Sequence, residues 1–230
     1  MQKENRQFLP VAVIVAGALI AAAIYFGGSG SAGNYGPNTL TGSQDSVEIA
    51  PVTSKDHILG DPSAKIVMVE YSDTECPFCK VFHSTLGQIM DTYKDTGIAW
   101  VYRQFPIVEL HARAPKEAEA TECVAEQGGN AAFWAFINKV FATTGSNDSL
   151  DPAELPIIAQ SVGLDVTAFN TCVSSGKYTN VITNDVAAAY KTGAQGTPYT
   201  VIQVGSKKSV IVGAQDYDTV KAAIDDLLKP

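Results

Sequence analysis

The sequence is short of positive charge. Its 230 residues hold 16 Lys and Arg against 24 Asp and Glu, which gives a formal net charge of −8. The chain has no basic run, and no Gly-rich phosphate-binding loop follows an apolar strand-like segment. Because nucleic-acid binding depends on a basic surface that neutralises phosphates, we expect no nucleic-acid partner.

Metal-ligating residues are also scarce. The only histidines lie far apart, at His57, His83 and His111. Of the four cysteines, Cys76 and Cys79 form a close pair, whereas Cys123 and Cys172 do not. A structural zinc site needs four ligands, and one C-x-x-C supplies only half of them. We therefore expect no metal, and we assign the histidines no role.

Charge is absent from residues 8–26, FLPVAVIVAGALIAAAIYF. As a helix this run spans roughly 28 Å, close to the ~30 Å of a bilayer's hydrocarbon core. Lys3 and Arg6 precede it, and the next basic residue is Lys55. The positive-inside rule then predicts a cytoplasmic N-terminus at residues 1–7, a single transmembrane helix, and an extracytoplasmic remainder at the cell membrane. The alternative is a cleaved signal peptide, which also exports the chain.

Residues 27–54 begin GGSGSAGNYGPN and contain little that a core needs, so they are typical of a flexible linker. The whole chain is 46% hydrophobic and 17% charged, as in globular proteins. We therefore expect one folded domain over residues 55–230.

Apolar periodicity predicts an α/β domain. A β-branched run at 64–72, an amphipathic segment at 76–96 and a second apolar run at 98–107 indicate a parallel βαβ unit. A block of helices follows, at 116–127, 131–144, 152–162, 165–174 and 178–192. The chain then returns to a β-hairpin at 198–204 and 209–213 and ends in a helix at 217–229.

The pair of cysteines in SDTECPFCK (72–80) lies where the first strand meets the first helix. The N-terminus of a helix stabilises a thiolate through its free N–H groups and its dipole, which favours Cys76 as a nucleophile. Cys79, one turn further on, is expected to be shielded. A zinc half-site and a structural disulfide are the alternatives, although a bridge across two residues stabilises little.

The segments VEYSDTECPFCK (69–80) and GTPYTVIQV (196–204), with a helical block between them, resemble the DsbA-like family of exported thiol:disulfide oxidoreductases. The resemblance covers about residues 55–230. It implies a thioredoxin-like fold with a helical insertion at about 109–192, here preceded by one transmembrane helix.

The resemblance also implies roles for individual residues. Cys76 is the attacking cysteine and Cys79 its buried partner, with Pro77 and Phe78 between them in the active-site loop. Thr197 and Pro198 match the family's cis-proline loop, which faces the active site and pairs with an extended substrate. Glu70 matches a buried acid that assists proton transfer. The alternative for Glu70 is a strand residue that faces solvent.

One departure concerns the dipeptide between the cysteines. The best-known oxidants of the family have Pro-His, whereas this chain has Pro77 and Phe78. Phe78 can neither carry charge nor donate a hydrogen bond, and Glu75 disfavours a second negative charge nearby. We therefore expect the pKa of Cys76 to be lowered less than in those oxidants, and the redox couple to be less oxidising.

The second cysteine pair, Cys123 and Cys172, falls on predicted helices of the insertion. The two residues are either two buried thiols or a disulfide, which an oxidising compartment favours. A structural disulfide in the helical domain also occurs in some membrane-linked members of the family that this chain resembles.

The expected function is the oxidation of thiols in exported proteins through Cys76 and Cys79, without a cofactor. The resemblance implies unfolded or extended polypeptides as substrates and an integral-membrane, quinone-linked partner that reoxidises the pair. We expect a monomer, since residues 27–54 are too short and polar to form the dimerisation domain of an isomerase. A reductase or isomerase, and a thioredoxin-fold chaperone or binding module, are the alternatives.

Overall fold

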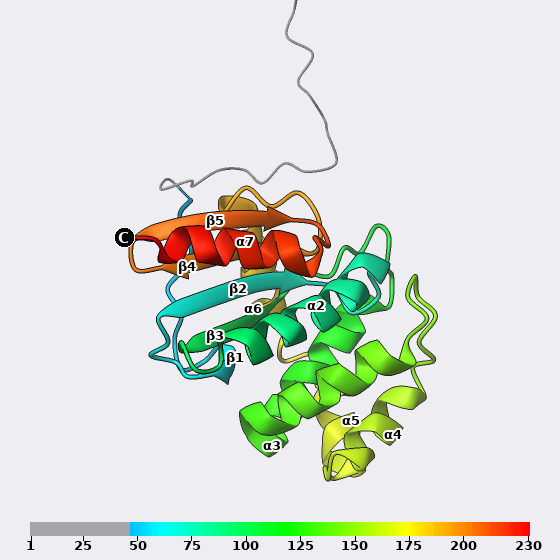
Figure 1. Ribbon diagram of the computed structural model, residues 1–230. Coiled ribbons are helices and arrows are strands. Elements are labelled where there is room, and N and C mark those ends of the chain that lie inside the picture. Colours follow the sequence, from blue (N-terminus) through cyan, green and yellow to red (C-terminus); the bar gives the residue numbers. More distant parts are fainter. Residues whose placement is uncertain (1–46) are drawn as a thin grey trace, which may run out of the picture. The chain divides into compact units, whose positions relative to one another are not determined.

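The computed structural model describes residues 47–230. They form a five-stranded sheet in the order β1-β3-β2-β4-β5, with helices on both faces (Figure 1). The predicted transmembrane segment, residues 8–26, and most of the predicted linker lie outside the described residues. Within residues 47–230, no helix is long and apolar enough to cross a bilayer.

The centre of the sheet is the predicted βαβ unit. β2 (Ile66–Ser72) pairs in parallel with β3 (Ile98–Gln104), and α2 (Pro77–Tyr93) connects them. On its other side, β2 pairs antiparallel with β4 (Tyr199–Val204), which forms the predicted hairpin with β5 (Lys207–Val212). Because β2 is the central strand, its C-terminal end delivers the cysteine turn to the middle of one sheet edge.

One of the two edge strands, β1, was not predicted. β1 (His57–Gly60) pairs antiparallel with β3. Upstream of β1, Val47 is buried, and Arg103 donates hydrogen bonds to the carbonyl oxygens of Ala50 and Pro51. The folded domain therefore includes residues 47–54, and the predicted boundary at residue 55 is too late. The segment is held by the apolar contacts of Val47 and Ile49 and by these backbone bonds, and two alternate apolar residues are too short a pattern to mark it in the sequence.

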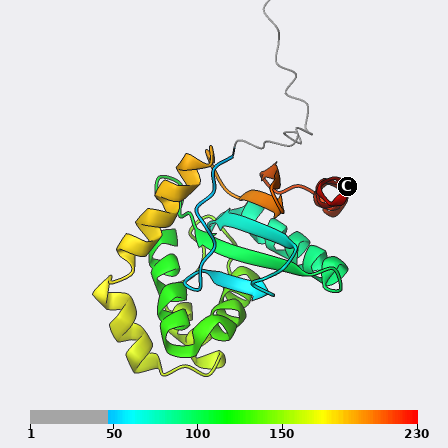
Figure 2. The same cartoon turned by 90° about the vertical axis from the view of Figure 1, so that its left-hand side faces the viewer.

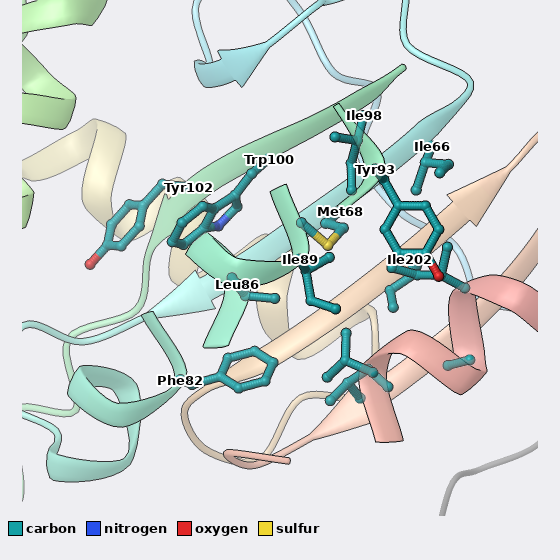
Figure 3. Close-up of a cluster of buried hydrophobic side chains, with 14 of the residues drawn as sticks. Ile66, Met68, Phe82, Leu86, Ile89, Tyr93, Ile98, Trp100, Tyr102 and Ile202 are labelled. Carbon is teal, nitrogen blue, oxygen red and sulfur yellow. The ribbon is translucent and has the colours of Figure 1, made fainter. Parts of the chain in front are cut away.

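Helices cover the sheet on two sides (Figure 2). α2 and α7 (Tyr217–Leu228) pack on one face, with the core drawn in Figure 3: Ile66, Met68, Phe82, Leu86, Ile89, Trp100 and Ile202 belong to it. The other face packs against α6 (Thr179–Lys191) through Val69, Val101 and Ala189. Alternation along β2 places Glu70 on the same face as Ile66 and Met68, which is the face of α2.

The remaining helices are α3 (Ala114–Thr143), α4 (Glu154–Ser161) and α5 (Val166–Ser175). Gly129, with φ 71°, divides α3 into two helical segments, in the gap between the predicted helices 116–127 and 131–144. These helices share a separate apolar core that contains Phe136, Leu155 and Phe169. The predicted insertion at 109–192 therefore has two parts, since α6 completes the sheet's second layer and only α3 to α5 build a core of their own.

Candidate active site

The two close cysteines lie at the start of α2. Cys76 is the N-cap residue, in an extended conformation, and Pro77 occupies the first turn, where a missing N–H costs nothing. Both cysteines are free thiols; Cys76 is 5% exposed and Cys79 is fully buried. Cys76 is thus the slightly more accessible of the two, and Cys79 lies one helical turn further in.

The surroundings of Cys76 and Cys79 shift the pKa values of the two thiols in opposite directions. A hydrogen bond from the Cys79 thiol, together with the Thr197 side chain and the N–H groups of Phe78 and Cys79, lowers the pKa of Cys76 to about 6. Burial raises the pKa of Cys79 well above its usual value. Near neutral pH the pair therefore holds one thiolate, on Cys76, and one thiol, on Cys79.

The segment with Thr197 and Pro198 faces these sulfurs. The Thr197-Pro198 peptide bond is cis, and the Cys76 thiol lies 3.6 Å from the Thr197 carbonyl oxygen. The same loop lines a cleft of about 390 Å³, together with Tyr199 and Val212. The structure thus brings together two motifs that are 121 residues apart in the chain.

Glu70 is fully buried, so the alternative of a solvent-facing position is wrong. Its Oε2 accepts a hydrogen bond from Trp100 Nε1 at 2.9 Å, while Oε1 has no partner among the described residues. Burial raises the pKa of Glu70 to about 7. A carboxyl group that gains and loses a proton near neutral pH therefore lies within electrostatic reach of both cysteines.

Apolar side chains are exposed on both segments that flank the cysteine turn. Phe78 and Val81 on α2 are 63% and 62% exposed, and Val108 and Leu110, after β3, are 53% and 68% exposed. Exposed apolar side chains therefore lie on two of the segments next to Cys76.

Glu75, which was expected to oppose the Cys76 thiolate, has partners far away in the sequence. Its buried carboxylate accepts hydrogen bonds from the backbone N–H groups of Ser149 and Leu150 and from the Thr144 hydroxyl. The loop that follows α3 therefore holds this carboxylate in place. Sequence reasoning considered only the neighbour in the chain and not this distant partner.

Sequence analysis missed two further residues at the turn, Asp73 and His111. Asp73 is buried directly after β2, and its Oδ2 lies 2.9 Å from Nδ1 of His111, which is also buried. The polar run SDTE before the cysteines was a usable signal for Asp73. No spacing in the sequence connects His111 with residues 38 positions earlier.

The other cysteine pair is a disulfide. Cys123 on α3 and Cys172 on α5 are joined with a Cα–Cα distance of 5.8 Å, and Cys123 belongs to the separate core of these helices. The other two histidines lie in core contacts: His57 stacks on Phe133, and His83 packs against Trp100. Over residues 47–230, no cluster of three or more His, Cys, Asp or Glu is arranged to hold a metal ion.

The sheet, the helix-capping cysteine and the cis-proline loop define a protein of the thioredoxin class. The profile of the thioredoxin family matches residues 52–226, and the chain belongs to this family.

Solved structures with the same fold include several DsbA proteins. DsbA2 of Pseudomonas aeruginosa is 30% identical, with a TM-score of 0.64 over 79% of this chain and 100% of that one. Alpha-DsbA1 of Wolbachia pipientis is also 30% identical, with a TM-score of 0.63 over 77% of this chain and 92% of that one. BdbD of Bacillus subtilis, at 24% identity, shares the fold with a TM-score of 0.69 over 81% of this chain and 100% of that one.

The curated relatives that match are much longer than this chain. The Na(+)/H(+) antiporter NhaA 3 of Salinispora tropica is 33% identical over 144 residues, which are 63% of this chain and 21% of the antiporter. NhaA 1 of Mycobacterium sp. (strain KMS) is 32% identical over 146 residues, 63% of this chain and 23% of the antiporter. The chain spans about a fifth of the length of these relatives, so we do not transfer ion transport to it.

Proposed function

We propose that the protein is a thiol:disulfide oxidoreductase that introduces disulfides into exported polypeptides through Cys76 and Cys79. The observation that carries the proposal is the unequal pair of thiols at the start of α2: Cys76 has a lowered pKa and is the more accessible, whereas Cys79 has a raised pKa and is fully buried. The likeness to DsbA structures, two of them at 30% identity, supports it.

The reaction starts from the Cys76–Cys79 disulfide. A substrate thiolate attacks Cys76, the accessible sulfur, and forms a mixed disulfide while the bond to Cys79 breaks. The second substrate thiolate then attacks the substrate sulfur of the mixed disulfide and releases Cys76 as a thiolate. The substrate loses two electrons and gains a disulfide, and the Cys pair gains two electrons.

The two cysteines differ in whether they take up a proton when they act as leaving groups. Cys76 leaves readily because a thiolate of low pKa is a good leaving group. Cys79 has a raised pKa and takes up a proton when it leaves. Glu70, which is buried, charge-coupled to Cys79 and has a pKa of about 7, is the group we propose to supply that proton.

Substrate binding follows from the surface around Cys76. The exposed side chains of Phe78, Val81 and Leu110 suit an unfolded or extended polypeptide, and the loop of Thr197 and Pro198 offers backbone groups beside the sulfur. We place the domain on the extracytoplasmic side of the cell membrane, anchored by residues 8–26. An integral-membrane, quinone-linked partner would reoxidise the pair.

The test is the reduction potential of the Cys76–Cys79 pair. The full-length protein is equilibrated in glutathione buffers and followed by the fluorescence of Trp100, whose indole bonds to Glu70. A value between about −120 and −180 mV supports an oxidase or isomerase. A value near −270 mV, as in thioredoxin, contradicts the oxidase.

A reductase or isomerase of the same fold is the second candidate, and the uncharged Phe78 favours it. Without a charged or hydrogen-bonding residue between the cysteines, the Cys76 thiolate is less stabilised and the couple more reducing. Reduction of a scrambled disulfide substrate at a rate above that of dithiol oxidation would favour this candidate.

A further inference from the structure

The dipeptide between the active-site cysteines offers the Cys76 thiolate no charge. Pro77 has no donor at all, and Phe78 contributes only its backbone N–H. Any counter-charge has to come from outside the C-x-x-C turn. One basic side chain is buried against this turn: His111, which lies in the loop between β3 and α3 and is 4% exposed.

His111 is attached to the turn through Asp73. Its Nδ1 donates to Asp73 Oδ2 at 2.9 Å, and the backbone N–H of Ile107, four residues earlier, donates to the same oxygen at 2.8 Å. The other carboxylate oxygen, Oδ1, accepts from the N–H of Glu75 at 2.8 Å. One buried carboxylate therefore holds both the histidine loop and the residue that precedes Cys76.

The backbone of Asp73 makes the connection to the sulfurs. Its N–H donates to Cys79 Sγ at 3.4 Å, and its carbonyl oxygen accepts from the N–H of Cys76 at 3.2 Å. Asp73 thus contacts both members of the redox pair and His111 at once. A change in the charge of His111 reaches the cysteines across a single residue.

We propose that His111, held by Asp73, is a positioning residue that supplies the counter-charge of the Cys76 thiolate and thereby sets the redox potential of the pair. The proposal deepens the proposed function and rests on it. In the protonated state His111 balances Asp73. Without that charge, a buried carboxylate stands unbalanced beside the sulfurs and opposes the thiolate.

Charged groups from each neighbouring segment act on His111. Asp73 follows β2, Cys76 starts α2, and Asp148 belongs to the loop after α3. Burial lowers the pKa of His111, but the hydrogen bond and charge of Asp73, with Cys76 and Asp148, raise it above its usual value overall. Asp148 is already engaged, since its carboxylate accepts from the N–H groups of Ala112 and Arg113.

The consequence for redox chemistry has a definite sign. The thiolate exists only in the reduced protein, so a cation beside it stabilises the reduced state and makes the disulfide a stronger oxidant. By linkage, the thiolate must favour protonation of His111 to the same extent. His111 should therefore titrate at a higher pH in the reduced protein than in the oxidised one.

The first experiment needs no substitution. The histidine ring signals of the full-length protein are followed by NMR over pH in the reduced and oxidised states, with His57 and His83 as internal references. We expect the pKa of His111 to fall by about one unit on oxidation and the others to move less. An equal pKa of His111 in both states overturns the proposal.

The second experiment uses a substitution that keeps the hydrogen bond. In His111→Asn the amide can donate to Asp73 as Nδ1 does, but it carries no charge. We expect a higher pKa of Cys76 and an equilibrium with glutathione shifted about tenfold towards the disulfide, which corresponds to about 30 mV. An unchanged potential in the folded variant overturns the proposal.

The matched control is His57→Gln. His57 also pairs with a buried carboxylate, since its Nε2 lies 3.0 Å from Glu122, but that carboxylate is on α3 and outside the cysteine turn. We expect the Cys76–Cys79 reduction potential of the His57→Gln variant to equal that of the wild type. If the wild type itself forms no reversible Cys76–Cys79 disulfide, the proposed function fails. If the wild type forms that disulfide but neither His111 experiment shows the expected shift, only this inference fails.

Discussion

The two cysteine pairs of the chain differ in almost every physical respect. Cys76 and Cys79 share one helical turn and are free thiols of opposite acidity. Cys123 and Cys172 are 49 positions apart and join two helices in a disulfide. A bridge across 49 positions restricts the unfolded chain, whereas one across a single turn restricts it little. In this chain the free pair is close in sequence, where a disulfide would stabilise the fold little, and the bonded pair is distant in sequence, where a disulfide stabilises it most.

We expect the largest effect from replacing Cys76. In Cys76→Ser we expect the oxidation of a dithiol peptide to fall to the uncatalysed rate, because a serine hydroxyl forms no mixed disulfide. In Cys79→Ser, given a peptide that carries a disulfide, we expect the Cys76 thiolate to attack that disulfide and the resulting mixed disulfide to accumulate, because no Cys79 thiol is present to displace the peptide. Mass spectrometry of the quenched reaction measures both. Full activity of Cys76→Ser would contradict the assignment of the nucleophile.

Removing the other pair should change stability and leave the chemistry intact. In the double variant Cys123→Ala, Cys172→Ala we expect the free energy of unfolding to fall by about 4 kcal/mol in the chain-entropy description. The reduction potential of Cys76 and Cys79 should stay at the wild-type value. Urea unfolding and glutathione equilibration measure the two quantities. A changed potential would show that the disulfide between α3 and α5 influences the redox pair.

The raised pKa of Glu70 should make the free energy of unfolding depend on pH. Its pKa is about 7 in the fold against 4.5 for an ordinary glutamate, so the folded protein binds the proton more tightly than the unfolded chain. Stability attributable to Glu70 is therefore greatest below pH 4.5 and is lost as pH rises towards about 7. In Glu70→Gln this loss should vanish.

The oxidised proteins are the ones to compare, since Cys76 and Cys79 do not titrate as a disulfide. The Glu70→Gln variant should match the wild type near pH 4.5 and exceed its free energy of unfolding by about 3 kcal/mol at about pH 8. Parallel stability profiles of the two proteins from pH 4.5 upwards would show that Glu70 does not have a raised pKa.

The smallest effect is expected from Phe78→His. The side chain is 63% exposed, so the exchange should not disturb the core. An imidazolium beside the sulfur should lower the pKa of Cys76 by about one unit and make the pair more oxidising. Thiolate absorbance at about 240 nm follows the titration. Phe78→Ala is the control, and an equal shift there would refute the electrostatic reason.

Most of the secondary structure followed from local patterns. The spacing of Phe82, Leu86 and Ile89 marks α2, and Gly129 marks the break in α3. β1 escaped because its four residues have an intermediate or exposed pattern, and it forms only by pairing with β3. Residues 47–51 were missed because only Val47 and Ile49 pack into the core, while Ala50 and Pro51 are held through their carbonyl oxygens by Arg103.

At the site, the sequence alone identified the two sulfurs that we propose to react. Cys76 and Cys79 stand where a strand turns into a helix, and this order of elements is local information. The tertiary structure alone decided how they react. The pKa of a group depends on its desolvation and on the charges around it. Those partners, Thr197 and His111 among them, come from segments that only the folded chain brings to the same turn.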